Sequence, residues 1–405
     1  MSTSHPDGSG AALRRCTGLG RAAFGADYWS REPLLSRHPG GFADLLCAAD
    51  VDELLTERGL RTPFFRVVQA GQTVAGTTRS AAAGNRRITD LVEPEAVRES
   101  YASGATLILN SLHRIHPPLV RFCRTLASEL GHPTQCNAYV TPPGSRGFAP
   151  HHDTHDVFVL QVDGAKKWNV YSPALTLPLT SQPSKSLSDA PLVADGAAPL
   201  LSVMLEPGDA LYLPRGYIHA AETNEQRSIH LTVGVTASTA YDVLRDVLEL
   251  AADEESFRRS LPLGGPEEQL ADVARIVAQA AAWLNALPGE RARDAARKRV
   301  SRHGGVEPLG MLASEDALLA FDKSALVRPR EGLVVTFAAD APPDRVVLQL
   351  PDRSLSLPAY VEPAVNALLE KPCQVSDLGL PVDDALVLVR RLLIEGMVTV
   401  ASGKP

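Results

Sequence analysis

The stretch FAPHHDTHDVFVL, residues 148–160, places three histidines and two aspartates directly before an apolar run. The β-branched and aromatic residues of the run predict a strand, so the polar cluster lies at the mouth of that strand. In an extended chain, residues i and i+2 point to the same side. His151 and Asp153 therefore form a same-face pair, and His152 points to the other face. Such a cluster is either a solvated loop or part of a metal site.

A further ligand is available 68 residues after His151, in the segment GDALYLPRGYIHAAE. His219 follows a PRG turn there and is predicted to end a strand. Two imidazoles and one carboxylate on one face of an iron ion leave positions open for substrate, co-substrate and O₂, as non-haem Fe(II) oxygenases require. His151, Asp153 and His219 are therefore the predicted metal ligands and catalytic centre. The other ionisable residues of the cluster keep the simpler interpretation of solvated or supporting polar groups.

Six short β-branched or aromatic runs follow one another from residue 136 to residue 235, separated by Gly, Pro and Asp. This succession predicts an antiparallel sandwich or barrel. Residues 176–199, rich in Ser, Pro and Ala, are predicted to form a long surface loop between two of the strands. Helical spacing comes before the runs and returns after residue 237. There, residues 266–287 are predicted to form one helix with a wide apolar face, suited to pairing with another helix, the barrel or a second chain.

Composition excludes several classes of protein. The chain has 47 acidic and 40 basic residues, a net charge of -7 at pH 7, which gives no electrostatic signal for nucleic acid. Its five cysteines include no CxxC pair, so a reducing compartment is expected. The N-terminus lacks an apolar signal-peptide core, and no run of about 18 apolar residues is present. A cytoplasmic protein that does not enter the membrane is therefore predicted.

If iron binds at the three ligands, the electrons for O₂ activation need a source, and no dinucleotide-binding fingerprint is present. 2-Oxoglutarate would supply them, and its far carboxylate would need a cation inside the barrel. Lys166 or Lys167 is placed for this, because a buried lysine is costly unless it is paired. For Lys167 the preferred interpretation is a residue flanking a turn. Asn137 and Tyr139 share one face of the preceding strand, and either bind the same acid or only satisfy the strand.

The segments PPGSRGFAPHHD, VFVLQVDGAKKWNVY and GDALYLPRGYIHAAE together resemble the JmjC-domain ribosomal oxygenases, also called the cupin-4 family. The resemblance covers the barrel, and the upstream FGADYWSREPLL and the helical tail follow the family's domain order. It implies an α+β protein with a double-stranded β-helix. The predicted domains are a JmjC/cupin jelly-roll catalytic domain 21–238, a helical dimerisation domain 239–303 and a winged-helix domain 304–405, and the polar residues 1–20 are predicted to be disordered.

The resemblance also implies a chemistry. Fe(II) would bind the three predicted ligands, and 2-oxoglutarate would pair with Lys166 and lie beside Asn137 and Tyr139. The implied reaction is hydroxylation of a histidine or arginine side chain of a ribosomal protein by a homodimer. This chain departs from the family at Gly234, where relatives tend to carry a small hydroxyl residue. Thr232 is therefore expected to complete the co-substrate pocket, and the long loop is expected to reshape the substrate entrance.

Other functions remain open at this point. The same chemistry would serve a ribosomally made peptide, a small metabolite or, less in keeping with this chain, demethylation of a lysine. A different class is a non-enzymatic winged-helix regulator with a ligand-sensing barrel. Residues 306–405 hold 14 acidic and nine basic residues, a net charge of -5, which disfavours DNA binding, although Arg390 and Arg391 are adjacent. A protein-contact role for this module is favoured.

Overall fold

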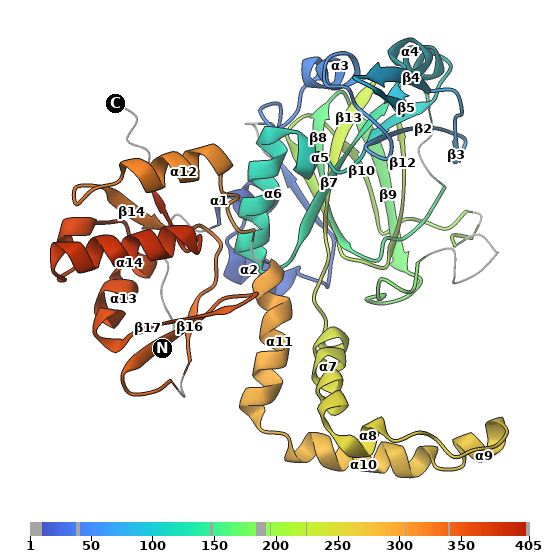
Figure 1. The fold of residues 1–405 in the computed structure, drawn as a ribbon. Helices are drawn as coiled ribbons and strands as arrows, with labels where there is room; N and C mark the ends of the chain where they lie inside the picture. Colours follow the sequence, from blue (N-terminus) through green and yellow to red (C-terminus); the bar gives the residue numbers. More distant parts are fainter. Residues whose placement is uncertain are drawn as a thin grey trace. The chain divides into compact units, whose positions relative to one another are not determined.

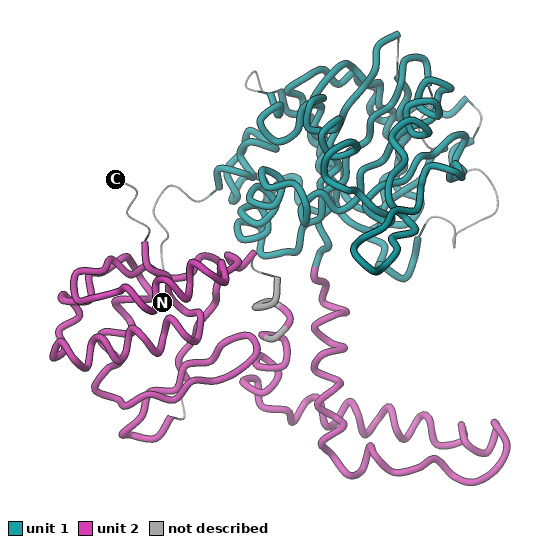
Figure 2. The backbone as a smooth tube through the Cα atoms, turned by 45° about the horizontal axis from the view of Figure 1, so that its top comes forward, with its two compact units in different colours: residues 1–237 teal, residues 238–405 magenta. Residues whose placement is uncertain are grey.

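The computed structural model describes the whole chain except residues 1–9, 38–40, 146–148, 184–191, 195, 224, 304, 339–340 and 402–405. The chain divides into two compact units, Met1–Ala237 and Ser238–Pro405, which Figure 2 shows in different colours. Residues 184–191 and 195 of the loop predicted at residues 176–199 lie outside the described residues, and the described part of this loop contains no strand.

Unit 1 is built on two antiparallel sheets (Figure 1). The larger has the order β1-β11-β8-β13-β7-β6-β2-β3 and the smaller the order β10-β9-β12. The strands of the larger sheet are β1 (Leu34–Arg37), β2 (Phe65–Gln69), β3 (Gln72–Thr73), β6 (Thr106–Leu109), β7 (Thr134–Thr141), β8 (Asp156–Asp163), β11 (Asp209–Leu213) and β13 (Ser228–Val235). Those of the smaller sheet are β9 (Lys166–Pro173), β10 (Leu201–Leu205) and β12 (Tyr217–Thr223). A separate hairpin joins β4 (Thr78–Ala83) and β5 (Arg86–Val92). The predicted jelly-roll is confirmed.

The strand that follows the histidine cluster, β8, is buried on both faces. Phe158 and Leu160 on one face belong to the main core, which helices cover, whereas Val157 and Val159 on the other face pack toward the smaller sheet, around Trp168. Double burial explains why this strand reads as an almost unbroken apolar run rather than an alternation. It also fixes the register, because a shift by one residue would exchange the two faces.

Helices of unit 1 pack on the outer side of the larger sheet (Figure 1). They are α1 (Ala11–Thr17), α2 (Arg21–Asp27), α3 (Ala48–Thr56), α4 (Pro94–Ala102), α5 (Leu112–Ile115) and α6 (Pro117–Leu130). In α6 the residues at helical spacing, Leu119, Phe122 and Leu126, are buried as their spacing predicts, and Gly131 ends the helix in the left-handed conformation.

The prediction that residues 1–20 are disordered is wrong for the part that the structure describes. Residues 11–17 form α1, whose Leu13 and Cys16 are buried in the main core. The carboxylate of Glu129 in α6 accepts hydrogen bonds from the backbone N–H groups of Gly10, Ala12 and Leu13. A distant acidic side chain therefore caps the start of this helix, and a polar N-terminal sequence gives no sign of such a partner.

Unit 2 begins with helices: α7 (Ala240–Leu248), α8 (Glu255–Arg258), α9 (Pro266–Leu270), α10 (Val273–Ala286), α11 (Gly289–His303) and α12 (Met311–Ala320). The single helix predicted over residues 266–287 is divided into α9 and α10 near Asp272. Arg299 in α11 donates two hydrogen bonds to Asp246 in α7, so these two helices are joined by an ion pair.

The remainder of unit 2 has its own core. It contains the sheets β18-β14-β19 and β15-β16-β17 together with α13 (Glu362–Glu370) and α14 (Val382–Ile394). The strands are β14 (Leu326–Pro329), β15 (Thr336–Phe337), β16 (Arg345–Gln349), β17 (Ser354–Pro358), β18 (Cys373–Gln374) and β19 (Val398–Val400). The predicted order helix, helix, strand is present as α13, α14 and β19. Among the residues described in either unit, no helix is both long and apolar enough to span a bilayer.

Candidate metal centre and adjoining pocket

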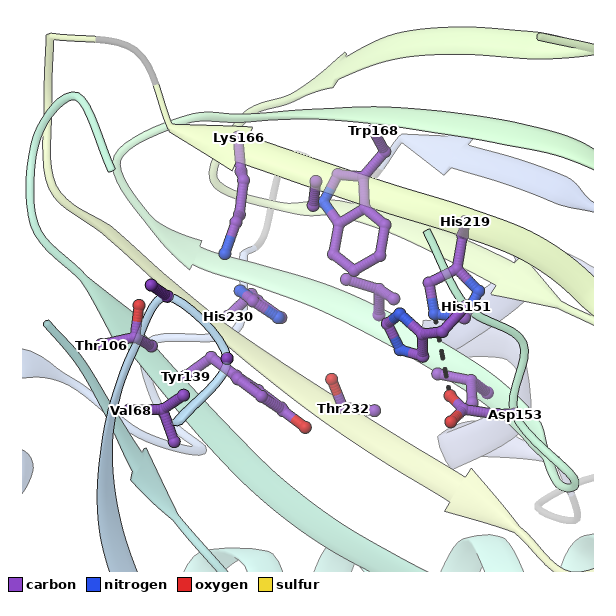
Figure 3. A pocket seen from close by; sticks show the side chains of 15 residues that line it. Val68, Thr106, Tyr139, His151, Asp153, Lys166, Trp168, His219, His230 and Thr232 are labelled. Carbon is purple, nitrogen blue, oxygen red and sulfur yellow. Dashed lines mark ion pairs between the residues drawn. The ribbon is translucent and has the colours of Figure 1, made fainter. Parts of the chain in front are cut away.

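Three predicted ligands meet at one end of the barrel of unit 1. One potential ligand atom from each of His151, Asp153 and His219 lies within 4.8 Å of the others. Asp153 Oδ2 is 3.8 Å from His219 Nε2, the pair joined by a dashed line in Figure 3, and the two imidazole centroids are 4.5 Å apart. Two imidazoles and a carboxylate at this spacing form a donor set for a divalent transition metal.

Backbone pairing brings these side chains together. His151 and His219 form an isolated antiparallel bridge, in which His151 N donates to His219 O at 3.2 Å and His219 N donates to His151 O at 2.8 Å. The prediction placed His151 and Asp153 on a strand, but β8 begins only at Asp156. The predicted same-face geometry therefore comes from a short extended segment before the strand, and His219 is the third residue of β12 rather than its end.

Both ligand imidazoles are oriented by backbone carbonyls. His151 Nδ1 lies 2.9 Å from Ala149 O, and His219 Nδ1 lies 3.1 Å from Tyr217 O. A carbonyl oxygen only accepts, so each Nδ1 carries the proton and each Nε2 is left with a lone pair. This tautomer is the one that a metal-binding imidazole needs when it coordinates through Nε2.

The protonation states also suit metal binding. Burial, with a further contribution from His151, lowers the pKa of His219 to about 4, so this imidazole is neutral near pH 7. Burial works to raise the pKa of Asp153, but the imidazoles around it, His219 foremost, bring that pKa below its ordinary value. The centre therefore offers a neutral imidazole and a carboxylate at neutral pH.

A pocket leads from the ligands to a buried lysine (Figure 3). Lys166 is 3% exposed, its Nζ donates to Thr141 Oγ1 at 3.1 Å, and burial lowers its pKa to about 7. Alternation along β9 explains why this lysine and not its neighbour lines the pocket: Lys167 lies on the outer face, where it pairs with Glu222 at 3.8 Å. The preferred interpretation of Lys167 as a flanking residue agrees with this placement.

Aromatic side chains that sequence reasoning missed form the wall between the lysine and the metal ligands. His230 stacks on Tyr139 with ring centroids 4.9 Å apart, and Trp168 meets His230 edge-on at 5.4 Å. Among the described residues, His230 Nδ1 and Trp168 Nε1 are buried without a hydrogen-bond partner. Strand alternation could have identified both residues, because alternate residues of a strand share a face. Trp168 lies two residues after Lys166, and His230 lies two residues before Thr232.

The co-substrate residues predicted on β7 and β13 are only partly brought to the pocket. Tyr139 and Thr232 line it, together with Thr106 and the tip of the β2–β3 hairpin. Asn137 does not, because its Oδ1 accepts the backbone N–H of Ser111 at 2.9 Å. Burial, reinforced by Asp153 and opposed in part by a hydrogen bond with Asn137, raises the pKa of Tyr139 to about 12. Asn137 therefore contacts Tyr139 but does not line the pocket.

The departure at Gly234 has a structural counterpart in His155. A β-carbon at position 234 would lie 2.3 Å from Cδ2 and 2.6 Å from Nε2 of His155, far inside van der Waals contact. The imidazole of His155 thus occupies the space that a hydroxyl residue at 234 would need. Gly234 does not itself line the pocket, whereas Thr232 does, as expected.

This packing predicts that Gly234→Ser forces the His155 ring aside and lowers the free energy of unfolding by about 1–3 kcal/mol, the usual cost of overpacking. In a His155→Ala background the same substitution is expected to cost much less, which urea unfolding of the two single variants and the double variant will measure. Gly25→Ser, where a β-carbon meets nothing within 4 Å, is the control. Equal losses with and without His155 would contradict the assignment.

Comparisons with known proteins agree with this geometry. A model of the JmjC domain family matches residues 109–243. The chain is 35% identical over 246 residues to human Ribosomal oxygenase 1, covering 58% of this chain and 36% of that protein. It is 30% identical over 245 residues to the Bifunctional lysine-specific demethylase and histidyl-hydroxylase NO66 of Drosophila persimilis, covering 60% of this chain and 34% of that protein. The matches thus span little more than a third of these relatives.

Among solved structures, the Escherichia coli ribosomal oxygenase YcfD in complex with cobalt and 2-oxoglutarate matches 95% of this chain and 99% of its own, with a TM-score of 0.54 at 16% identity. At that identity the match establishes the fold. The resemblance that the sequence motifs indicated is confirmed: residues 109–243 match the JmjC domain family, and the chain is similar in sequence to ribosomal oxygenase 1.

Proposed function

We propose that this chain is an Fe(II)- and 2-oxoglutarate-dependent oxygenase that hydroxylates a histidine or arginine side chain of a ribosomal protein. The observation that carries the proposal is the convergence of His151, Asp153 and His219 at one end of a pocket that also contains the buried Lys166. The names of the relatives, ribosomal oxygenase and histidyl-hydroxylase, support the reaction class. The cobalt and 2-oxoglutarate bound to the E. coli protein support the two ligands.

The donor set fits iron. His151 and His219 would bind through Nε2 and Asp153 through a carboxylate oxygen, and three protein ligands leave further positions of a six-coordinate ion for co-substrate and O₂. Iron with 2-oxoglutarate supplies the oxidising power for hydroxylation of a C–H bond. The hydrogen bonds from Nδ1 to backbone carbonyls keep both imidazoles in the required tautomer.

The far end of the pocket fits a carboxylate. Among the described residues, Lys166 donates to the Thr141 hydroxyl and pairs with no carboxylate, and burial of its ammonium is costly until an anion arrives. His230 Nδ1 and Trp168 Nε1 are buried and unpaired among the described residues, which leaves polar groups for a bound acid or water. Val157 and Val159 line the same pocket and exclude water along its side.

The target and the roles of unit 2 are further parts of the proposal. A side chain of a protein or peptide would approach the metal ligands from the pocket mouth, and the ribosomal target rests on the names of the relatives alone. We also propose that residues 239–303 form a dimer interface and residues 304–405 a winged-helix module. Exposed apolar side chains on α7 and α10, namely Tyr241, Leu244, Leu248, Val273 and Val277, support the first.

The oxygenase proposal predicts that the protein releases succinate from 2-oxoglutarate only when Fe(II) is present. His151→Ala is expected to abolish this turnover, because the variant loses one of three ligands. His152→Ala, which changes the neighbouring imidazole of the same cluster that contacts Gln182 O, is the control and is expected to keep measurable turnover. Full turnover by His151→Ala would refute the metal assignment.

The target is tested by mass spectrometry of ribosomal proteins from cells that express either the wild-type chain or the His151→Ala variant. A gain of one oxygen on a histidine or arginine, present only with the wild-type chain, would support the ribosomal target. Iron-dependent succinate release with unchanged ribosomal proteins would instead favour a peptide or a small metabolite as substrate.

Lys166 predicts the pH dependence of 2-oxoglutarate binding. Its pKa of about 7 means that the amine loses its charge as pH rises above 7, so binding of the dianion must take up a proton. The Kd of 2-oxoglutarate is expected to rise by about tenfold per pH unit between about pH 7.5 and 9, measured by calorimetry on the Co(II)-loaded chain. Lys166→Met should weaken binding by about 100-fold and remove the pH slope.

The charged form of Lys166, which favours binding of the acid, destabilises the folded chain. The pKa of Lys166 is lower in the folded chain than the ordinary 10.5, so its burial destabilises the fold below about pH 10, most fully below pH 7. Lys166→Met is therefore expected to keep or raise the free energy of unfolding at pH 7, although it weakens the binding of 2-oxoglutarate. Lys167→Met, on the outer face, is the matched control; equal effects of both variants on binding would contradict the role of Lys166.

The dimer proposal predicts that the chain sediments as a homodimer at micromolar concentration. Leu244→Glu combined with Val277→Glu should shift the chain to monomer, because both side chains are exposed and apolar in α7 and α10. Leu319→Glu, at an exposed position of α12 outside residues 239–303, is the control. A monomeric wild-type chain, or dissociation by the control alone, would contradict the interface.

A further inference from the structure

The chain crosses from the larger sheet to the smaller at a tight corner, residues 214–216, between β11 and β12. His219 lies four residues after Arg215 in this corner, whereas His151 and Asp153 lie just before β8. The relative position of the three ligands therefore depends on how the corner is held against the segment that leads into β8.

Two backbone contacts hold the corner. Gly216 N donates to Asp153 O at 3.0 Å, and the His151–His219 bridge lies three residues further along the chain. Gly216 has φ of +94°, and a β-carbon there would lie 2.2 Å from Leu175 O. No other residue fits this position without moving backbone, so the turn depends on glycine.

One buried ion pair joins the same two segments through side chains. Arg215 Nη1 donates to Asp156 Oδ2 at 3.0 Å, and the backbone N–H of Arg215 contacts Asp156 Oδ1 at 3.4 Å. Tyr212 OH donates to the same Oδ1 at 2.8 Å. The Asp156 side chain is 0% exposed and that of Arg215 8% exposed. Asp156 is three residues after Asp153, so the pair links the two ligand-bearing segments directly beside the ligands.

A contact from the N-terminal segment completes the arrangement. Arg215 Nη1 also donates to Ser30 Oγ at 3.0 Å, and Ser30 N donates to Tyr212 OH at 2.9 Å. The carboxylate of Asp156 therefore accepts from three groups, and the Arg215 guanidinium compensates its charge. Such a pair is a weak source of net stability, because desolvation of both charges offsets their attraction. Its geometry, by contrast, is strongly restricted.

We propose that the Asp156–Arg215 pair positions the metal centre: it fixes the corner so that His219 stays in place for one ion shared with His151 and Asp153. Neither residue touches the ion; both act through the backbone of the segments that carry the ligands. This inference rests on the metal site in the proposed function, but it concerns metal affinity and not turnover. It assigns a function to the PRG turn and to the last aspartate of the HHDTHD cluster.

The test uses the full-length metal-free chain and Co(II) alone, titrated by its visible absorption in competition with a chelator. Asp156→Asn keeps the shape of the side chain but removes its charge, and Arg215→Lys keeps the charge but loses the planar fork. Asp209→Asn is the matched control: Asp209, at the opposite end of β11, is buried and pairs with Arg37 at 2.6 Å. Urea unfolding of each variant measures its loss of stability.

Asp156→Asn is expected to weaken Co(II) binding by about tenfold or more and to change its absorption band, with Arg215→Lys between it and the wild type. Asp209→Asn should lose stability but bind Co(II) within about twofold of the wild type. Binding by Asp156→Asn as tight as by Asp209→Asn would overturn the proposal. If circular dichroism shows that Asp156→Asn does not fold, Co(II) binding by Arg215→Lys is compared with that of Asp209→Asn instead, and equally tight binding would overturn the proposal. A wild-type chain that binds no Co(II) would refute the metal site itself.

Discussion

The reciprocal backbone pairing of His151 with His219 is the contact on which the candidate site depends. It joins a segment entering the larger sheet to a strand of the smaller sheet, through two hydrogen bonds of 3.2 and 2.8 Å. Burial and proximity to His151 penalise a charge on His219, so its contact with Asp153 is not a charged pair near pH 7. Amide hydrogen bonds are insensitive to this penalty, so the scaffold brings the donors together before any ion is present.

The other end of the pocket shows the opposite situation, a positive group without an anion. Lys166 is buried beside a hydroxyl, and His230 and Trp168 present polar atoms that pair with nothing among the described residues. A fold selected only for stability would place apolar residues there. Unsatisfied polarity in the middle of a well-packed barrel is the kind of local conflict that functional sites retain, and it points to an anionic ligand.

Sequence patterns predicted an antiparallel sandwich or barrel and the ligands His151, Asp153 and His219, and the family resemblance added the jelly-roll and the choice of Lys166. Alternation along a strand separates Lys166 from Lys167, and turn residues mark the strand ends. The missed features depend on partners distant in sequence. Glu129 caps a helix that the polar N-terminus did not predict, and Ser111 draws Asn137 away from the pocket. Neither partner is marked by spacing or composition, so only the tertiary structure identifies it.

The register of the strands links stability to chemistry in this barrel. Along β13, His230 and Thr232 line the pocket, while Leu231 and Val233 lie in the main core. A slip of one residue would bury the polar pair and expose the apolar pair, so the core that stabilises the barrel also specifies the pocket wall. Gly234 continues the same face as far as His155, where a missing side chain makes room for an imidazole. The absence of a side chain at Gly234 is therefore a matter of packing against His155, whereas Thr232 and Lys166 on the neighbouring positions line the pocket.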